Sequence, residues 1–98
     1  MANQHHLNKL REGVEAWNQW RQDFPEITPD LSGATLTEAH LQRADLTSVN
    51  LRDASLMRAN LTEARLSGAN LRDANLAGAT LVGANFEGAE TRGCLGCP

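Results

Sequence analysis

Leucine or phenylalanine returns at every fifth position over most of this chain, without an insertion. Alanine or valine stands two positions before nearly every one of them, and mostly polar residues fill the remaining places. A period of five is neither the period of about 3.6 of an α-helix nor the period of about two of a flat strand. The pattern therefore predicts neither a plain amphipathic helix nor a simple strand. The repeated apolar positions are Leu31, Leu36, Leu41, Leu46, Leu51, Leu56, Leu61, Leu66, Leu71, Leu76, Leu81 and Phe86.

The spacing within each unit predicts the path of the backbone. The small residue and the leucine are two positions apart, so both side chains point to one face of an extended step. Three positions then pass before the next small residue, which leaves room for a bend. A chain of steps and bends with its apolar side always inward winds into a coil, and stacked coils pair their backbone groups as in a solenoid. Asn and Asp before the leucine, and Gly at the end of many units, suit the bends.

These units resemble the consensus of the pentapeptide repeat family, Ala-(Asp/Asn)-Leu-X-X, over residues 29–93. The chain is most similar to the short stand-alone bacterial members, especially those of cyanobacteria. The resemblance implies an all-β solenoid, a right-handed quadrilateral β-helix with four pentads per turn and therefore about three coils. The repeated leucines and Phe86 would line the inside of this tube.

A turn of four pentads would also bring opposite charges together on neighbouring coils. Glu38 would stack with Arg58, Arg43 with Glu63, and Asp45 with Arg65. Such neighbours contribute about 0.2–1 kcal/mol each. Arg52, Arg72 and Arg92 would form a like-charged column, either solvated beside local acids or facing an anionic partner.

The first 28 residues follow a different, helical pattern. Apolar residues fall within an arc of about 140°, which predicts one amphipathic helix over residues 4–24, with Asn3 as N-cap and Pro25 beyond its end. The first coil of a solenoid exposes apolar side chains and unpaired backbone, so we expect the helix to cap it. The alternative is that this face docks a partner or a membrane surface, although its polar side has few basic residues. The expected cap residues are Leu10, Val14, Trp17, Trp20 and Phe24.

No comparable segment follows the repeats. An uncovered end invites pairing with another chain. We expect two chains to stack with these ends together as a homodimer, or the chain to stack on another repeat protein. The chain then divides into a capping helix and linker (1–28), the repeats (29–93) and a tail (94–98). The candidate interface residues are Phe86, Thr91, Cys94, Leu95 and Cys97.

Cys94 and Cys97 have the spacing of a redox motif or of half a metal site. A thioredoxin-like motif needs a βαβ unit, and zinc takes about four ligands, so we expect ordinary thiols in a frayed tail. An interchain disulfide and a metal shared across a dimer are the alternatives. We expect His5 and His6 in solvent and His40 at the surface. No nucleophile, phosphate-binding or paired-acid motif is present, so we expect no enzyme, cofactor or metal site.

Composition limits the function classes further. The net charge is −3, and no basic patch predicts direct nucleic-acid binding. No apolar stretch predicts a membrane span and no secretory signal opens the chain, so we expect a cytoplasmic protein. The expected function is a non-catalytic structural or protein-interaction module. The alternative, implied by some family members, is a DNA mimic that acts on a type II topoisomerase. Residues 29–98 hold eight acids and six arginines. A mimic of this length needs a surplus of about nine negative charges.

Overall fold

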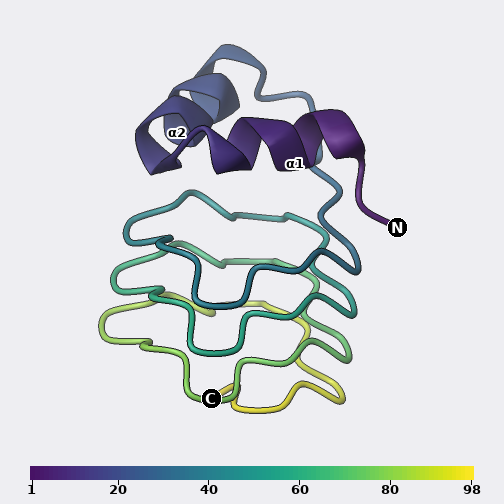
Figure 1. Ribbon diagram of the computed structural model, residues 1–98, viewed down its shortest axis with the longest axis vertical. Coiled ribbons are helices and arrows are strands. Elements are labelled where there is room, and N and C mark those ends of the chain that lie inside the picture. Colours follow the sequence, from purple (N-terminus) through teal and green to yellow (C-terminus); the bar gives the residue numbers. More distant parts are fainter.

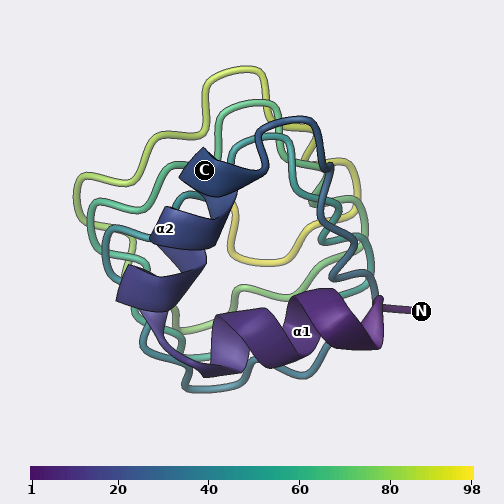
Figure 2. The same cartoon turned by 90° about the horizontal axis from the view of Figure 1, so that it is seen from above.

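A computed structural model describes the whole chain, Met1–Pro98. The chain begins with two helices, α1 (Gln4–Arg11) and α2 (Val14–Asp23), and continues as a stack of coils to the C-terminus (Figure 1). The helices lie across one end of the stack, along two adjacent sides of the first coil, and the last coil forms the other end (Figures 1 and 2). Neither helix has the length and apolar character needed to cross a bilayer.

The single helix expected over residues 4–24 is wrong, because Gly13 divides it. The backbone of Gly13 has φ = 117°, a conformation that other residues rarely adopt. The N–H groups of Glu12 and Gly13 donate back to the carbonyls of Lys9 and Leu10 and end α1. The carbonyl of Gly13 then accepts from Trp17 at the start of α2. The break lets α1 and α2 follow two different sides of the coil beneath them (Figure 2). Asn3 is the N-cap of α1, as predicted.

The coils pair with one another in parallel at a constant separation of twenty residues, from Asp30–Asn50 to Asn75–Leu95. These pairs are isolated bridges, so the all-β expectation needs a correction: the solenoid contains no continuous strand. The reason is that each pentad places most of its residues in a turn. Pairing also continues to Leu95, two positions beyond the boundary expected at residue 93.

Every pentad makes the same tight turn. The N–H group of the residue after the turn donates to the carbonyl of the leucine three positions before, at 3.1 Å from Ala34 to Leu31 and similar distances elsewhere. The residue before the donor has positive φ, as in Asp53 (63°) and Glu63 (58°). This combination is typical of a type II β-turn. Seven residues other than glycine hold this position, so coil pairing outweighs their local preference.

The leucines of the repeats point inward and form one core with the small residues beside them. Those from Leu31 to Leu76 expose no more than 6% of their surface. Leu81 and Phe86 are only partly buried, because no further coil covers them. The core therefore runs from the helices at one end to an open face at the other.

Candidate interaction surfaces at the two ends of the stack

The backbone of the first coil presents hydrogen-bonding groups toward the helices. In a later coil, the N–H group of the residue before the leucine donates to the preceding coil, as from Asn50 to Pro29. The carbonyl of the same residue accepts from that coil, as from Leu31 to Asn50. In the first coil no preceding coil exists to pair with these groups. We call them the first-coil edge: the backbone N–H and C=O groups of Asp30, Thr35, His40 and Asp45.

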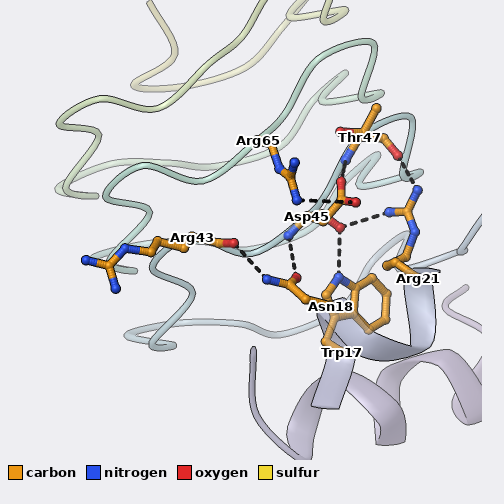
Figure 3. A network of polar contacts seen from close by, with 7 residues as sticks. All are labelled: Trp17, Asn18, Arg21, Arg43, Asp45, Thr47 and Arg65. Atoms are coloured by element: carbon orange, nitrogen blue, oxygen red, sulfur yellow. Dashed lines mark hydrogen bonds and ion pairs between the residues drawn. The ribbon is translucent and has the colours of Figure 1, made fainter. Parts of the chain in front are cut away.

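Side chains of α2 pair with the first-coil edge at Asp45 (Figure 3). The indole Nε1 of Trp17 donates to the Asp45 carbonyl at 2.8 Å, and Nη1 of Arg21 donates to the same oxygen at 2.9 Å. The N–H group of Asp45 donates to Oδ1 of Asn18 at 2.8 Å, while Nδ2 of Asn18 donates to the Arg43 carbonyl at 3.0 Å. The Oδ1 atom of Asn18 thus takes the place of a backbone carbonyl of a missing coil.

The carboxylate of Asp45 lies near two arginines, one from α2 and one from the second coil. Burial raises its pKa, but hydrogen bonds from Thr47 and the charges of Arg21 and Arg65 outweigh burial and lower the pKa overall. The Arg65 Nη2 atom lies 3.7 Å from the carboxylate. Nη2 of Arg21 also donates to the Thr47 carbonyl at 2.8 Å. Arg21 therefore joins two positions of the first coil to α2.

The N-terminal segment pairs with the first-coil edge at Asp30. The N–H group of Asn3 donates to the Asp30 carbonyl at 2.9 Å. The N–H group of Asp30 donates to Nδ1 of His6 at 3.0 Å, and the His6 ring packs on Trp20 with centroids 5.3 Å apart. The expectation that His6 is simply solvated is therefore wrong, whereas His5 is exposed. Burial, followed by the nearby His5, lowers the pKa of His6, which favours the unprotonated Nδ1 that this bond needs.

The apolar face of the helices packs on the same coil. Trp17 is completely buried, Leu10 and Trp20 are buried, and Val14 is half-buried. Phe24 differs from the expected cap residues because 44% of its surface is exposed. It follows the last residue of α2 with φ = −129°, so its side chain leaves the helix face and touches only the edge of this cluster. Helical spacing placed Phe24 on the apolar arc, but the helix ends one residue too early.

The last coil has no partner for its outward backbone groups. In the interior of the stack, two N–H groups of each pentad donate to the following coil. One belongs to the leucine and the other to the residue with positive φ. In the last coil these N–H groups have no acceptor, and the carbonyls of the small residues have no donor. The unpaired donors are Gly78, Leu81, Gly83, Phe86, Gly88, Thr91 and Gly93, and the unpaired acceptors include Ala79, Ala84 and Ala89.

The side chains around this open face are mostly small or apolar. No charged residue occurs from Ala74 to Phe86. Val82 exposes 70% of its surface and Leu95 exposes 61%. Thr91 is half-buried at a leucine position. We call Leu81, Val82, Phe86, Leu95 and the unpaired backbone groups of the last coil the open face.

Cys94 and Cys97 form a disulfide within the chain, which corrects the expectation of ordinary thiols in a frayed tail. Gly96 makes this closure sterically feasible. It stands where the period would place a leucine, and its φ is 78°. A Cβ atom at Gly96 would lie 2.8 Å from the Leu76 carbonyl, so a larger residue could not bend back in this way. Glycine at a leucine position was the signal in the sequence for this turn. Both cysteines are half-buried against the end of the core.

Cross-coil ion pairs occupy the sides of the stack. All three pairs expected from a turn of four pentads are present: Arg43–Glu63 at 3.1 Å, Arg58–Glu38 at 3.5 Å and Arg65–Asp45 at 3.7 Å. Of the expected arginine column, Arg72 pairs with Glu90 at 2.6 Å, and Arg52 and Arg92 pair with no acid. His40 is exposed. No three His, Cys, Asp or Glu side chains converge in an arrangement that would hold a metal ion.

Comparisons with known proteins agree with this architecture. The family described as pentapeptide repeats matches residues 30–62 and 54–90, more than half of the chain. Rfr23, a pentapeptide repeat protein from the cyanobacterium Cyanothece 51142, is similar at 35% identity with a TM-score of 0.52; the match covers 67% of this chain and 52% of Rfr23. HetL of Nostoc sp. strain PCC 7120, a pentapeptide repeat protein involved in the regulation of heterocyst differentiation, has 36% identity and a TM-score of 0.32, with 66% and 37% of the two chains covered. No curated protein matches the sequence.

Proposed function

Because this chain belongs to the pentapeptide repeat family, we propose that it is a non-catalytic protein-interaction module that self-associates through its open face. In this proposal about three coils form a quadrilateral β-helix, and α1 and α2 cap its first coil. The observation that carries the proposal is the difference between the two ends. Helix side chains pair with two of the four positions of the first-coil edge, whereas the last coil leaves a row of backbone groups without partners.

The open face has the composition of a surface that pairs with its own copy. It presents both donors, such as the N–H groups of Leu81 and Phe86, and acceptors, such as the carbonyl of Ala84. It also carries exposed apolar side chains and no charge from Ala74 to Phe86. Its charged residues are Glu87, Glu90 and Arg92, of which Glu90 is paired with Arg72, so electrostatic repulsion of a second copy is limited to one part of the face. Unpaired backbone at the edge of a sheet-like stack readily pairs with another chain.

The covered first coil also determines which assembly can form. The helices occupy the other end, so a second copy cannot continue the stack head to tail. Only the two open faces can meet, around a two-fold axis, and such an interface closes at two copies. The expected assembly is therefore a dimer rather than a filament.

The paired charges on the sides of the stack favour this proposal over a DNA mimic. A mimic needs a continuous negative surface. Here the acids Glu38, Asp45 and Glu63 each lie next to an arginine of a neighbouring coil.

Sedimentation equilibrium over a range of concentrations tests self-association. We expect the wild-type chain to reach a dimer, and Val82→Arg and Leu95→Arg to weaken the dimer at least about tenfold by placing charges on the interface. Both side chains are already exposed, so these variants should keep the monomer fold. Gln42→Arg, at an exposed position directly after a leucine of the first coil, is the matched control. A wild-type chain that stays monomeric at about 1 mM would contradict the proposal, as would equal effects of V82R and Q42R.

A further inference from the structure

The first-coil edge has four equivalent positions, and the helices satisfy only two of them. At Asp30 and Asp45 the backbone N–H groups donate to His6 and Asn18. The N–H and C=O groups of Thr35 and His40 have no hydrogen-bond partner in the chain. In later coils, the N–H and C=O groups at this position of the pentad point toward the preceding coil. In the first coil the helices stand in place of a preceding coil, so these groups of Thr35 and His40 point toward the helix end.

Two open cavities lie at these unpaired positions, between α1 and the first coil. One, of about 280 Å³, includes Leu10, Leu36, Leu41 and His40 among its lining residues. The other, of about 360 Å³, includes Leu7 and Thr35. Arg11 borders both cavities. We call the two cavities together the α1 groove.

Arg11 gives this groove an unpaired positive side chain at the border of both cavities, and the α-amino group of Met1 adds a positive charge at one of them. Arg11 makes neither an ion pair nor a side-chain hydrogen bond. Glu12 pairs with Lys9, and Glu38 of the first coil pairs with Arg58. Glu15, four positions after Arg11, forms no ion pair with it. A ligand of the groove would therefore gain most from a carboxylate placed at Arg11.

We propose that the α1 groove binds a short extended peptide segment of a partner protein, with an acidic side chain at Arg11. The peptide backbone would supply both an acceptor and a donor to the edge at Thr35 or His40, as the Asn18 amide does for Asp45 and Arg43. An apolar side chain beside the acid would pack on Leu10, Leu36 and Leu41. This surface lies at the opposite end from the open face and is independent of self-association.

The groove favours a peptide over nucleic acid for two reasons. Nucleic-acid binding rests on several phosphate contacts made by basic side chains, and this groove offers one Lys or Arg side chain, Arg11, besides the α-amino group of Met1. The edge also presents N–H and C=O groups together, so the best ligand both donates and accepts from adjacent atoms. A peptide group meets that requirement, and a phosphate does not.

The test is a titration of the full, ¹⁵N-labelled chain with the peptide acetyl-Leu-Asp-Leu-Ala-amide, observed by NMR. We expect the amide signals of Thr35, His40 and Leu36 to shift in a saturable manner, without shifts at Leu81 or Phe86. The same peptide with Asn in place of Asp should bind about tenfold more weakly, because it loses the charge-assisted contact with Arg11.

Variants of the chain make the test specific. Arg11→Gln should weaken binding of the Asp peptide about tenfold and remove its advantage over the Asn peptide. Arg52→Gln, which alters another arginine without an ion pair, should leave binding unchanged. The proposal is overturned if the amides of Thr35 and His40 do not shift at millimolar peptide, or if R11Q and R52Q bind the Asp peptide equally well.

Discussion

The two ends of this molecule are built from the same pentads but end in different ways. At the first coil, side chains from two helices supply the donors and acceptors that a preceding coil would supply. At the last coil, the same kinds of backbone groups have no partner. The comparison shows that a solenoid need not end on another strand, because an indole, an amide and an imidazole can replace peptide groups at defined positions.

Burial of the leucines follows the same division. Leu41 and Leu46 lie at the helix end and are buried, while Leu81 and Phe86 occupy the equivalent places two coils further on and are only partly covered. The pentads alone therefore do not set the burial of a leucine. The elements stacked on either side of it do: the helices cover the leucines of the first coil, and no element of the chain covers those of the last coil.

The largest expected effect comes from breaking the helix end at Trp17. Trp17→Ala removes a completely buried ring and the donor to the Asp45 carbonyl, and should lower the free energy of unfolding by about 3–5 kcal/mol. Urea denaturation followed by circular dichroism measures this change. Val82→Ala, at an exposed position of the last coil, should change it by less than about 0.5 kcal/mol in dilute solution, where the chain is monomeric. Similar costs for the two variants would show that the helices add little to stability.

A pair of leucine substitutions sharpens the comparison along the core. Leu56→Ala leaves a cavity at a fully buried site and should cost about 2–5 kcal/mol. Leu81→Ala should cost less, about 1–2 kcal/mol in dilute solution, because Leu81 is already partly exposed. If the open faces associate, the cost of L81A should grow with protein concentration, whereas that of L56A should not. Denaturation at two concentrations distinguishes these outcomes, and a concentration-independent L81A would argue against the dimer.

Reduction of the disulfide should have a smaller effect at the open end. Closure of so short a loop between Cys94 and Cys97 stabilises the chain by at most about 2 kcal/mol. Denaturation with and without dithiothreitol measures the difference. The double variant Cys94→Ser, Cys97→Ser should match the reduced protein and be insensitive to the reagent. A wild-type chain equally stable in both conditions would show that the disulfide does not hold the last turn.

The period of five predicted the solenoid. The separation between paired coils and the three cross-coil ion pairs followed only from the resemblance to the pentapeptide repeat family, which implies a turn of four pentads. The pattern did not predict the disulfide, because the repeats end at residue 93 in the sequence and Cys94 and Cys97 then fall in a tail. The isolated bridges were also missed, since the pattern does not say how much of each pentad a turn consumes.

The contacts of the helix end could not be predicted from pattern. Asn18, Arg21 and His6 lie among polar residues of an amphipathic segment, and their spacing is no different from that of solvated residues. Their roles depend on the break at Gly13, which sets the directions of both helices over the coil. Only the placement of α1 and α2 reveals which polar side chains meet the edge at Asp30 and Asp45.

The smallest expected effect concerns His6 and pH. The pKa of His6 is lowered from 6.5 in the folded chain, so between the folded and unfolded pKa values the unfolded chain binds more protons. The contribution of His6 to stability is therefore complete above about pH 6.5 and is lost as the pH falls through the folded pKa. His6→Gln retains a side-chain acceptor for the Asp30 N–H group but does not titrate, so its unfolding free energy should fall less than that of the wild type between pH 7 and pH 5. His40→Gln is the control, because no backbone group donates to the His40 ring. The same pH dependence in H6Q and the wild type would mean that the bond between His6 and Asp30 does not contribute to closing this end of the stack.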